Sequence, residues 1–342
     1  MAGGRGQRFW PLSTEARPKQ FLDLEQTGRT LLQTTVDRVL PLLGSPERLF
    51  VASGTRYLPL IREQLPELPE ANLLVEPEAR DSAPAIALSA LRIKARLGDV
   101  TMGVFSSDHR VEDAAAFHRV VSDAVSLAEQ QQGLVSIGVT PTRPATGYGY
   151  VERGDPSGAG FEVVRFVEKP NRAKAEAYVA GGRHLWNAGM FVWPVDTILN
   201  ELRLHAADLM NPLDRAFADG SVDQAFGRLP KISIDYAVME KTDRAFVVEG
   251  NFGWDDIGDW AALERLLPAA DGAGGAVFGP HAGHDAQGNI VYTDGADDVL
   301  VAYGVKDLVI VKRGDTVLVL PKSRVGDIKA VLEDERLREW VP

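Results

Sequence analysis

Residues 72–106 have the sequence NLLVEPEARDSAPAIALSALRIKARLGDVTMGVFS, in which two apolar runs flank a longer amphipathic stretch. Asn72–Val75 and Val100–Ser106 have the length and composition of buried strands, and Ala83–Leu97 between them has helical periodicity. Two strands joined through a helix form the unit from which parallel sheets covered by helices are built. The stretch therefore predicts an α/β fold.

The same alternation continues on both sides of this stretch. Further strands are expected at Leu49–Ser53 and Leu134–Val139, and further helices at Thr30–Leu43, Arg56–Leu65 and Asp113–Gln132. Ligands of such sheets bind outside the carboxyl ends of the strands. The polar residues that closely follow predicted strands are therefore candidate site residues, and they include Glu76 and Asp108.

The second half of the chain has a different pattern. We expect a strand pair at Tyr148–Arg153 and Phe161–Val167, a strand at Trp186–Trp193, and helices at Val195–Leu209 and Trp260–Leu267. Pro268–Gly288 is rich in Ala, Gly and Pro and is interpreted as a linker. After it we expect a small β unit and a last helix, in this order: Asn289–Tyr292, Val299–Tyr303, Leu308–Lys312, Thr316–Pro321 and the helix Val325–Leu337. The predicted domains are residues 1–270 and 280–342, divided near residue 275.

Composition excludes several classes of protein. The 342 residues are 45% hydrophobic and 25% charged, as in ordinary globular proteins, and no apolar run is long enough to span a membrane. Cysteine is absent, which excludes disulfides, thiolate metal sites and cysteine nucleophiles. A formal net charge of −11 argues against a general nucleic-acid binder. The N-terminus lacks a signal-peptide pattern, and a cytoplasmic enzyme is expected.

A glycine-rich segment, Gly3-Gly4-Arg5-Gly6-Gln7-Arg8, is followed by Pro18-Lys19. Closely spaced glycines let backbone N–H groups approach a phosphate, and the flanking cations add positive charge. The segment matches neither a Walker loop nor a dinucleotide fingerprint. By itself it could equally be a surface turn, but Arg8 and Lys19 favour a phosphate-binding loop.

This loop is the first of many ordered segments that resemble the sugar-phosphate nucleotidylyltransferase family, and more narrowly its mannose-1-phosphate guanylyltransferase branch. The resemblance is strong over about residues 1–265 and loose beyond. The other segments that carry it are Phe9–Ser13, Pro18–Leu22, Glu76–Pro77, Arg80–Ala85, Ser107–His109, Pro141–Pro144, Thr146–Tyr150, Phe166–Pro170, Trp186–Phe191, Ser233–Ala237 and Gly253–Gly258.

The resemblance implies a Rossmann-like nucleotidyltransferase domain with a mostly parallel central sheet, followed by a small C-terminal β domain that is left-handed β-helix-like. It implies transfer of GMP from GTP to α-D-mannose 1-phosphate, which gives GDP-mannose and pyrophosphate, with Mg²⁺ as cofactor and a homodimer as the assembly. Another nucleotide or sugar 1-phosphate, such as glucose or a heptose, is an alternative. A non-catalytic homologue that senses nucleotide sugars is a second alternative, but the presence of Arg8, Lys19, Asp108 and Asp256 favours catalysis.

The resemblance also assigns the metal to two carboxylates. Asp108 and Asp256 would hold Mg²⁺, which prefers carboxylate and phosphate oxygens. Asp255 is the alternative to Asp256, and the alternative role for Asp108 is to cap the next helix. His109 is interpreted as a structural neighbour, because imidazole suits zinc better than magnesium.

The remaining site residues divide by substrate. Arg8, Lys19, Asp108 and Asp256 are the expected catalytic residues. The expected nucleotide-binding residues are Ala2, Gly3, Gly4, Gly6, Arg8, Lys19, Glu76, Ser82, Ala83 and Asp108. Either the Glu76 carboxylate or backbone groups near Ser82 and Ala83 would recognise guanine. The sugar phosphate would be bound by Gly147, Glu168, Lys169 and Asn187, although Asn187 is equally typical of a turn.

One feature departs from the family. Its members have an apolar strand directly before the glycine loop, whereas only Met1 and Ala2 precede Gly3 here. We therefore expect the native chain to carry additional apolar residues before Met1, which intact-mass measurement of the native protein would detect.

Overall fold

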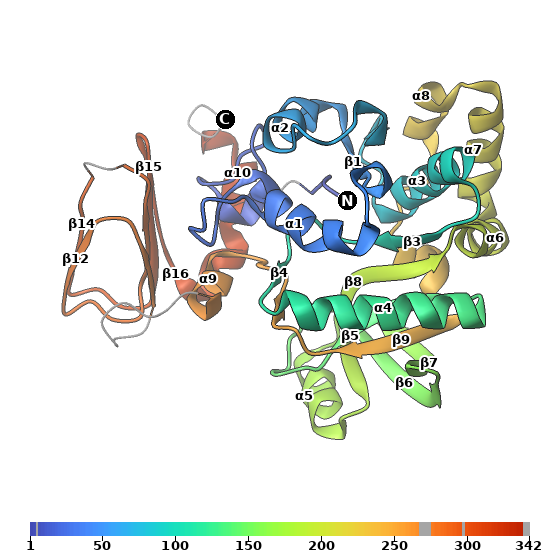
Figure 1. Ribbon diagram of the computed structural model, residues 1–342. Helices are drawn as coiled ribbons and strands as arrows, with labels where there is room; N and C mark the ends of the chain where they lie inside the picture. Colours follow the sequence, from blue (N-terminus) through green and yellow to red (C-terminus); the bar gives the residue numbers. More distant parts are fainter. Residues whose placement is uncertain (5, 267–274, 296–297, 338–342) are drawn as a thin grey trace. The chain divides into compact units, whose positions relative to one another are not determined.

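The computed structural model describes residues 1–4, 6–266, 275–295 and 298–337 (Figure 1). The chain folds as two compact units. Unit 1 consists of Met1–Gly3, Arg38–Ser106 and Val111–Trp254, and unit 2 of Gly4–Asp37, Ser107–Arg110 and Asp255–Pro342. Three elements contain a boundary between the units: α1 (Leu31–Leu43), β4 (Arg110–Val111) and β10 (Trp254–Asp255).

Unit 1 is an α/β unit, as predicted. Its strands are β1 (Val51–Gly54), β2 (Leu73–Glu76), β3 (Thr101–Val104), β5 (Leu134–Val139), β6 (Tyr150–Ser157), β7 (Gly160–Val167), β8 (His184–Pro194) and β9 (Ala245–Gly250). Its helices are α2 (Leu58–Gln64), α3 (Ser82–Leu97), α4 (Ala114–Gln131), α5 (Arg172–Gly181), α6 (Val195–His205), α7 (Ala207–Asp219), α8 (Val222–Ala225) and the π-helical turn η7 (Asp235–Met239).

The largest sheet of unit 1 has the order β3-β8-β5-β9-β7-β6. Both β3 and β5 pair antiparallel with β8, so they run in one direction, and β9 pairs parallel with β5. The hairpin of β6 and β7 extends the sheet, and β1 and β2 form a separate parallel pair. The strands that alternate with helices in the sequence therefore run parallel, and β8 is inserted between two of them in the opposite direction.

Helices cover both faces of this sheet. Successive side chains of a strand point to opposite faces, so Met190 and Val192 of β8 join one core whereas Phe191 and Trp193 join another. The first core contains α4, which lies along the sheet in Figure 1, and the second contains α3, α6 and α7. Burial on both faces explains why all six residues of β5 are apolar or small and buried.

Met1–Gly3 lies beside β1 without forming a strand. The N–H of Ala2 donates to the carbonyl of Ala52 over 2.8 Å, and the Ser53 hydroxyl donates to the carbonyl of Ala2 over 2.9 Å. The amino group of Met1 donates to the carbonyl of Phe105, directly after β3. These three hydrogen bonds fix the start of the glycine-rich segment in unit 1.

Unit 2 contains the remainder of that segment and the C-terminal β domain. Its helical elements are η1 (Gln7–Phe9), η2 (Lys19–Phe21), α9 (Trp260–Leu266), η9 (Lys322–Asp327), α10 (Ile328–Glu333) and η10 (Glu335–Leu337). Its strands are β11 (Ala276–Phe278), β12 (His281–His284), β13 (Ile290–Thr293), β14 (Leu300–Tyr303), β15 (Leu308–Arg313) and β16 (Thr316–Pro321).

The β domain is built from two parallel ladders, as a β-helix is. One ladder consists of β11, β13 and β15, and the other of β12 and β14. The Asn289 side chain joins neighbouring turns of the chain, because it donates to the Val305 carbonyl and accepts from the N–H of Leu308. Strand β16 pairs antiparallel with β15 at the edge of its ladder. The predicted small C-terminal β unit is therefore confirmed.

The core of unit 2 also anchors the glycine-rich segment. Phe9 is fully buried and packs against Trp260, with 5.3 Å between the ring centroids. The indole N–H of Trp260 donates to the carbonyl of Trp10. The Arg313 guanidinium donates to the carbonyls of Pro11 and Leu12. The backbone at Trp10, Pro11 and Leu12, between the glycines and Lys19, is thereby held by residues distant in sequence.

Some predicted elements were wrong or missed. The linker predicted at Pro268–Gly288 contains β11 and β12, whereas its residues 268–274 lie outside the described part of the chain. The predicted division near residue 275 stays a prediction. Strand β9 and helix α5 were missed, and the expected helix Val195–Leu209 is divided into α6 and α7 by a break at Ala206.

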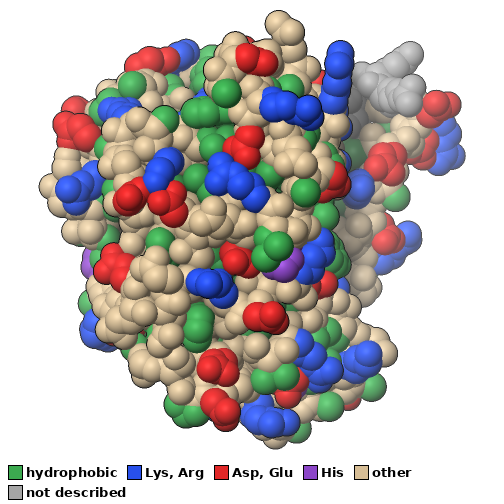
Figure 2. Space-filling model, turned by 90° about the vertical axis from the view of Figure 1, so that its right-hand side faces the viewer, with side chains coloured by type: hydrophobic (Ala, Val, Ile, Leu, Met, Phe, Trp, Pro, Cys, Tyr) green, Lys and Arg blue, Asp and Glu red, His purple; other side chains and the backbone are tan. Residues whose placement is uncertain are grey.

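Figure 2 shows one face of the molecule, on which Lys and Arg side chains are interspersed with Asp and Glu side chains. The excess of negative charge is therefore not gathered into one acidic block on that face. Among the described residues, none of the helices combines the length and apolar composition needed to cross a bilayer.

Candidate functional site

Lys19 is the centre of a polar cluster in unit 2. Its side chain is only 6% exposed, and its ammonium nitrogen lies 3.0 Å from Oδ2 of Asp108. The same nitrogen donates to the carbonyls of Asp256 and Ile257 over 2.7 and 3.0 Å. A buried ammonium requires such partners, because an unpaired charge away from water is strongly unfavourable. Three segments that are distant in sequence therefore meet at Lys19.

The carboxyl group of Asp108 stays ionised in this cluster. Burial acts to raise its pKa, but the Lys19 ammonium and His109 outweigh that effect and hold the pKa below its usual range. Its side chain keeps 30% exposure, and Nε2 of His109 lies 3.7 Å from Oδ1. The helix cap considered for Asp108 is instead made by Asp113, whose side chain accepts from the N–H of Ala116 at the start of α4.

The two neighbouring aspartates have different surroundings. Asp255 accepts from the Arg265 guanidinium and from the N–H of Ile257, so its carboxylate is used within the fold. The Asp256 carboxylate lies over Gly258, where an added Cβ would be 3.1 Å from Oδ2. Between them, Ile257 has a φ of 43°, a left-handed conformation that β-branched residues rarely adopt. The contacts of Lys19 and Asp255 hold this strained residue and thereby fix the backbone that carries Asp256.

Gly6 packs directly against Lys19. Its φ is 56°, and a Cβ at this position would lie 2.6 Å from the Cβ of Lys19. Only glycine combines that conformation with so close an approach. The Gln20 side chain donates to the carbonyl of Gly4 over 3.0 Å, whereas Arg8 and Gly4 are exposed. The structure thus brings Gly4, Gly6 and Lys19 together.

Glu76 is the last residue of β2 in unit 1, and only 7% of its surface is exposed. Burial raises the pKa of its carboxyl group to about 7. A Cβ on Gly3 would lie 3.8 Å from Oε1 of Glu76, so the predicted nucleotide-binding residues Gly3 and Glu76 are neighbours, and the buried Ala2 precedes them. A buried carboxyl that can gain or lose a proton near neutral pH is a typical feature of functional sites.

The backbone donors of Ser82 and Ala83 are already used. The N–H of Ser82 donates to the side chain of Asp81, and the N–H of Ala83 donates to the carbonyl of Ile232. The Ser82 hydroxyl accepts from the N–H of Ile234. These bonds cap the start of α3 and connect it to the segment before η7.

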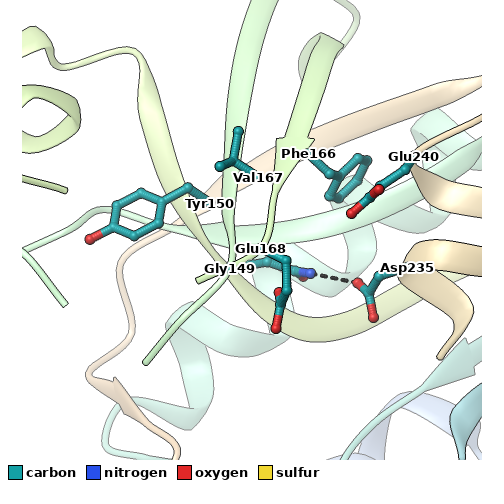
Figure 3. Close-up of a pocket in the computed structure, with 8 residues that line it drawn as sticks. Gly149, Tyr150, Phe166, Val167, Glu168, Asp235 and Glu240 are labelled. Atoms are coloured by element: carbon teal, nitrogen blue, oxygen red, sulfur yellow. Dashed lines mark hydrogen bonds between the residues drawn. The ribbon is translucent and has the colours of Figure 1, made fainter. Parts of the chain in front are cut away.

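A pocket in unit 1 contains two of the predicted sugar-phosphate residues, Glu168 and Asn187 (Figure 3). A Cβ on Gly149 would lie 2.6 Å from Oε2 of Glu168 and 3.5 Å from the Cβ of Asn187, so a side chain at position 149 would displace the Glu168 carboxylate from its present place. Lys169 lies beside them, with its ammonium 2.5 Å from Oε1 of Glu168, and this hydrogen bond raises its pKa. Gly147 is exposed and does not line the pocket.

Two further acidic residues of this pocket were missed by the sequence analysis. Asp235 accepts a hydrogen bond of 2.8 Å from the Asn187 amide, and Glu240 lies beside Phe166. Burial, and then the neighbouring carboxylates, raise the pKa of Asp235 and of Glu240. Asp235 belongs to one of the ordered segments, Ser233–Ala237, but the sequence alone does not indicate that the segment returns to the sheet beside Asn187.

The two groups of residues suit the transfer of an anionic group. In unit 2 a buried ammonium and two aspartates stand beside a glycine loop, as expected where phosphates bind. In unit 1 the pocket offers acidic and amide oxygens, which accept from hydroxyl groups, with an ammonium next to them. Among the described residues no group of three or more His, Asp and Glu could hold a metal ion by itself.

Known proteins resemble the chain over nearly its whole length. Residues 1–270 match the family model of the nucleotidyl transferases, and residues 279–334 match that of the MannoseP isomerase/GMP-like beta-helix domain. Mannose-1-phosphate guanylyltransferase of Escherichia coli K12 is 38% identical over 97% of this chain and 72% of its own length. The xanthan biosynthesis protein XanB of Xanthomonas campestris is also 38% identical, over 97% of this chain and 71% of its own.

The likeness extends to a solved structure, named mannose-1-phosphate geranyltransferase, from Thermus thermophilus. It is 39% identical, superposes with a TM-score of 0.90, and covers 99% of this chain and 98% of its own. The order of the matched segments, the α/β unit and the β domain thus agree with the family models. The chain belongs to the nucleotidyl transferase family, among relatives that are named mannose-1-phosphate guanylyltransferases.

Proposed function

We propose that this protein transfers GMP from GTP to α-D-mannose 1-phosphate, giving GDP-mannose and pyrophosphate. The cluster of Lys19, Asp108 and Asp256 is the observation that carries this proposal, because it joins a buried cation to the glycine loop and to both candidate metal ligands. The names of the relatives support mannose 1-phosphate as the acceptor and guanine as the base.

The chemistry requires neutralisation of charge more than it requires a base. The phosphate of the sugar 1-phosphate has a second pKa near ~6, so at neutral pH it is already an anion that can attack the α-phosphorus of GTP. Two anions must approach each other, and positioned cations lower that barrier. We assign this role at the triphosphate to Lys19 and Arg8, and at the sugar phosphate to Lys169.

Mg²⁺ is the proposed cofactor, with Asp108 and Asp256 as its protein ligands. The fit rests on the donor set: Asp108 has a lowered pKa and stays ionised, and two carboxylates with substrate phosphates are a usual environment for Mg²⁺. When bound, the ion would neutralise phosphate charge and orient the triphosphate. Lys19 ion-pairs with Asp108 and fixes the Asp256 backbone, so it positions both ligands.

Pyrophosphate release tests the activity directly. We expect Mg²⁺-dependent release with GTP and α-D-mannose 1-phosphate, and slower release with ATP, CTP and UTP or with glucose and heptose 1-phosphates. Faster release with another nucleotide and sugar 1-phosphate would change the proposed substrates but leave the proposed type of reaction in place. No release with any pair, together with retained binding of GDP-mannose, would instead favour a non-catalytic sensor. The homodimer implied by the family and the cytoplasmic location expected from the sequence remain proposals, which sedimentation and cell fractionation would test.

We expect Glu76→Gln to lower the preference for GTP over ATP. Guanine presents adjacent N1–H and N2–H₂ donors, which an ionised carboxylate can accept, whereas adenine presents an acceptor at N1. The N–H groups of Ser82 and Ala83 already donate within the protein, which favours Glu76 as the residue that recognises guanine. Bidentate contacts of this kind are worth about 1–3 kcal/mol, so the ratio of kcat/KM values should fall about 5- to 150-fold.

The pH dependence gives a second measurement of the same role. Because the pKa of Glu76 is raised to about 7, the fraction of ionised carboxylate rises between pH 6 and pH 8. The GTP preference of the native protein should rise over that range, whereas that of Glu76→Gln should stay flat. The KM for mannose 1-phosphate serves as the control and should hardly change. An unaltered GTP:ATP ratio in the variant would assign base recognition to backbone groups.

A further inference from the structure

Asn187 stands at an irregularity of strand β8. Phe191 pairs with Ser136, and Asn187 pairs with Gly138. Between these two pairs β8 advances by four residues and β5 by only two, so β8 contains a bulge. Gly189, with a φ of 63°, lies inside this bulge, and its N–H donates to Oδ1 of Asn187 over 3.1 Å. Bulges of this kind redirect a side chain next to a binding site. The bulge therefore fixes the oxygen end of the Asn187 amide.

The nitrogen end of the same amide is fixed from a different part of the chain. Nδ2 of Asn187 donates to Oδ1 of Asp235 over 2.8 Å, and Asp235 begins the π-helical turn η7. Figure 3 shows the Glu168 and Asp235 side chains extending to the same side of the sheet, with this hydrogen bond beside them. π-Helical turns are uncommon and are frequently found at functional sites.

We propose that Asp235 is a positioning residue of the sugar subsite and sets the orientation of the Asn187 amide; this inference rests on the proposed function. An amide has two N–H donors and two acceptor lone pairs. Asp235 takes one donor and the bulge takes one lone pair, so Asn187 presents one donor and one acceptor in a fixed order. An amide held in this way offers its donor and its acceptor at fixed positions to the hydroxyls of the sugar, so the amide itself needs no ordering when the sugar binds.

The requirement for an acceptor explains the acidic side chain at position 235. A carboxylate is acceptor-only when ionised, so it admits only the nitrogen end of the amide. Asparagine at position 235 could present its oxygen to Asn187 and preserve the contact, whereas alanine could not. Without the contact only the Gly189 N–H holds the Asn187 amide, so its nitrogen end is no longer fixed for the sugar.

A double-mutant cycle on binding of α-D-mannose 1-phosphate tests this role, with the dissociation constant measured by calorimetry in the absence of GTP. We expect Asp235→Ala to raise it about tenfold, in line with the loss of a hydrogen bond to a charged group. Asp235→Asn should keep it within about threefold of the native value. In an Asn187→Ala background, Asp235→Ala should change it less than about twofold.

Several controls separate positioning from other roles. Asp243→Ala makes the same change at an exposed position of the following turn and should leave the dissociation constant unchanged. The dissociation constant for GTP should be native in all variants.

If Asp235→Ala fails to fold, a double variant in which the two side chains are exchanged, Asn187→Asp with Asp235→Asn, replaces it. This exchange keeps one donor and one acceptor in the pair, so it should bind the sugar phosphate more tightly than Asn187→Asp alone.

The outcomes are decisive. Equal losses from Asp235→Ala in both backgrounds would show direct contact with the sugar and overturn the inference, as would an Asp235→Asn variant that is as impaired as Asp235→Ala. Absence of binding for every hexose 1-phosphate would overturn it too. If the effects of the substitutions at positions 187 and 235 on sugar-phosphate binding are coupled but no pyrophosphate is released, only the proposed function is contradicted. That result would support the role of Asp235.

Discussion

Replacement of Asp108 or Asp256 by asparagine should lower kcat about a thousandfold or more while the protein remains folded. Loss of a metal ligand at a phosphoryl site removes several kcal/mol of stabilisation of the transition state, and each ~1.4 kcal/mol corresponds to a factor of ten. The measurement is Mg²⁺-dependent pyrophosphate release, together with a thermal melt of each variant.

The structure explains why the fold should survive these changes. An asparagine at position 108 would still offer an oxygen to the Lys19 ammonium, and the bond from Lys19 to residue 256 goes to its backbone carbonyl. Asp255→Asn is the matched control, because it makes the same change one residue away. It weakens the pair with Arg265 and so should mainly lower the melting temperature. If Asp255→Asn lost more activity than Asp256→Asn, the assignment of the metal to Asp256 would be wrong.

The second large effect is expected at Lys19. Lys19→Ala should lower kcat about a hundredfold or more and change the KM for mannose 1-phosphate little, because its charge acts at the triphosphate in the transition state. The variant also leaves the carbonyls of Asp256 and Ile257 without their shared donor. We therefore expect kcat to remain low even at saturating Mg²⁺ and GTP.

Lys169→Ala is the comparison for this prediction. Lys169 belongs to unit 1, where its largely exposed ammonium pairs with Glu168. The variant should therefore mainly raise the KM for mannose 1-phosphate, by about tenfold. Steady-state kinetics with each substrate varied in turn measure both effects. Reversed results, with kcat affected at Lys169 and KM at Lys19, would exchange the two phosphate sites.

The sequence predicted those elements whose pattern is local. The bounds of β5 agree with the prediction at both ends, and α3 and α4 agree within one residue, because their apolar periodicity is regular and aspartate caps begin both helices. Strand β9 was missed because its burial depends on the distant neighbours β5 and β7. The linker was wrong because β11 and β12 lie within its glycine- and alanine-rich residues, so this composition does not by itself distinguish a linker from a β domain.

The site shows the same division. Lys19, Asp108 and Asp256 were predicted from short motifs, and the structure brings them together. The left-handed Ile257 and the hydrogen bond from Asn187 to Asp235 could not be predicted, since each depends on backbone geometry and on contacts between segments far apart in sequence. Gly147 shows the converse, because the motif that suggested it does not place it in the pocket.

The reversal of direction at β16 makes the C-terminal coil self-limiting. A parallel ladder offers the same evenly spaced hydrogen-bonding groups at each new edge, so it can in principle continue into a fibre. Strand β16 runs antiparallel to β15 at that edge, so a further strand in the direction of the ladder would meet an antiparallel neighbour, and the parallel repeat ends there. Extra coils designed into this domain should therefore be inserted before β15, where each new strand finds parallel neighbours, and the terminating strand should be kept.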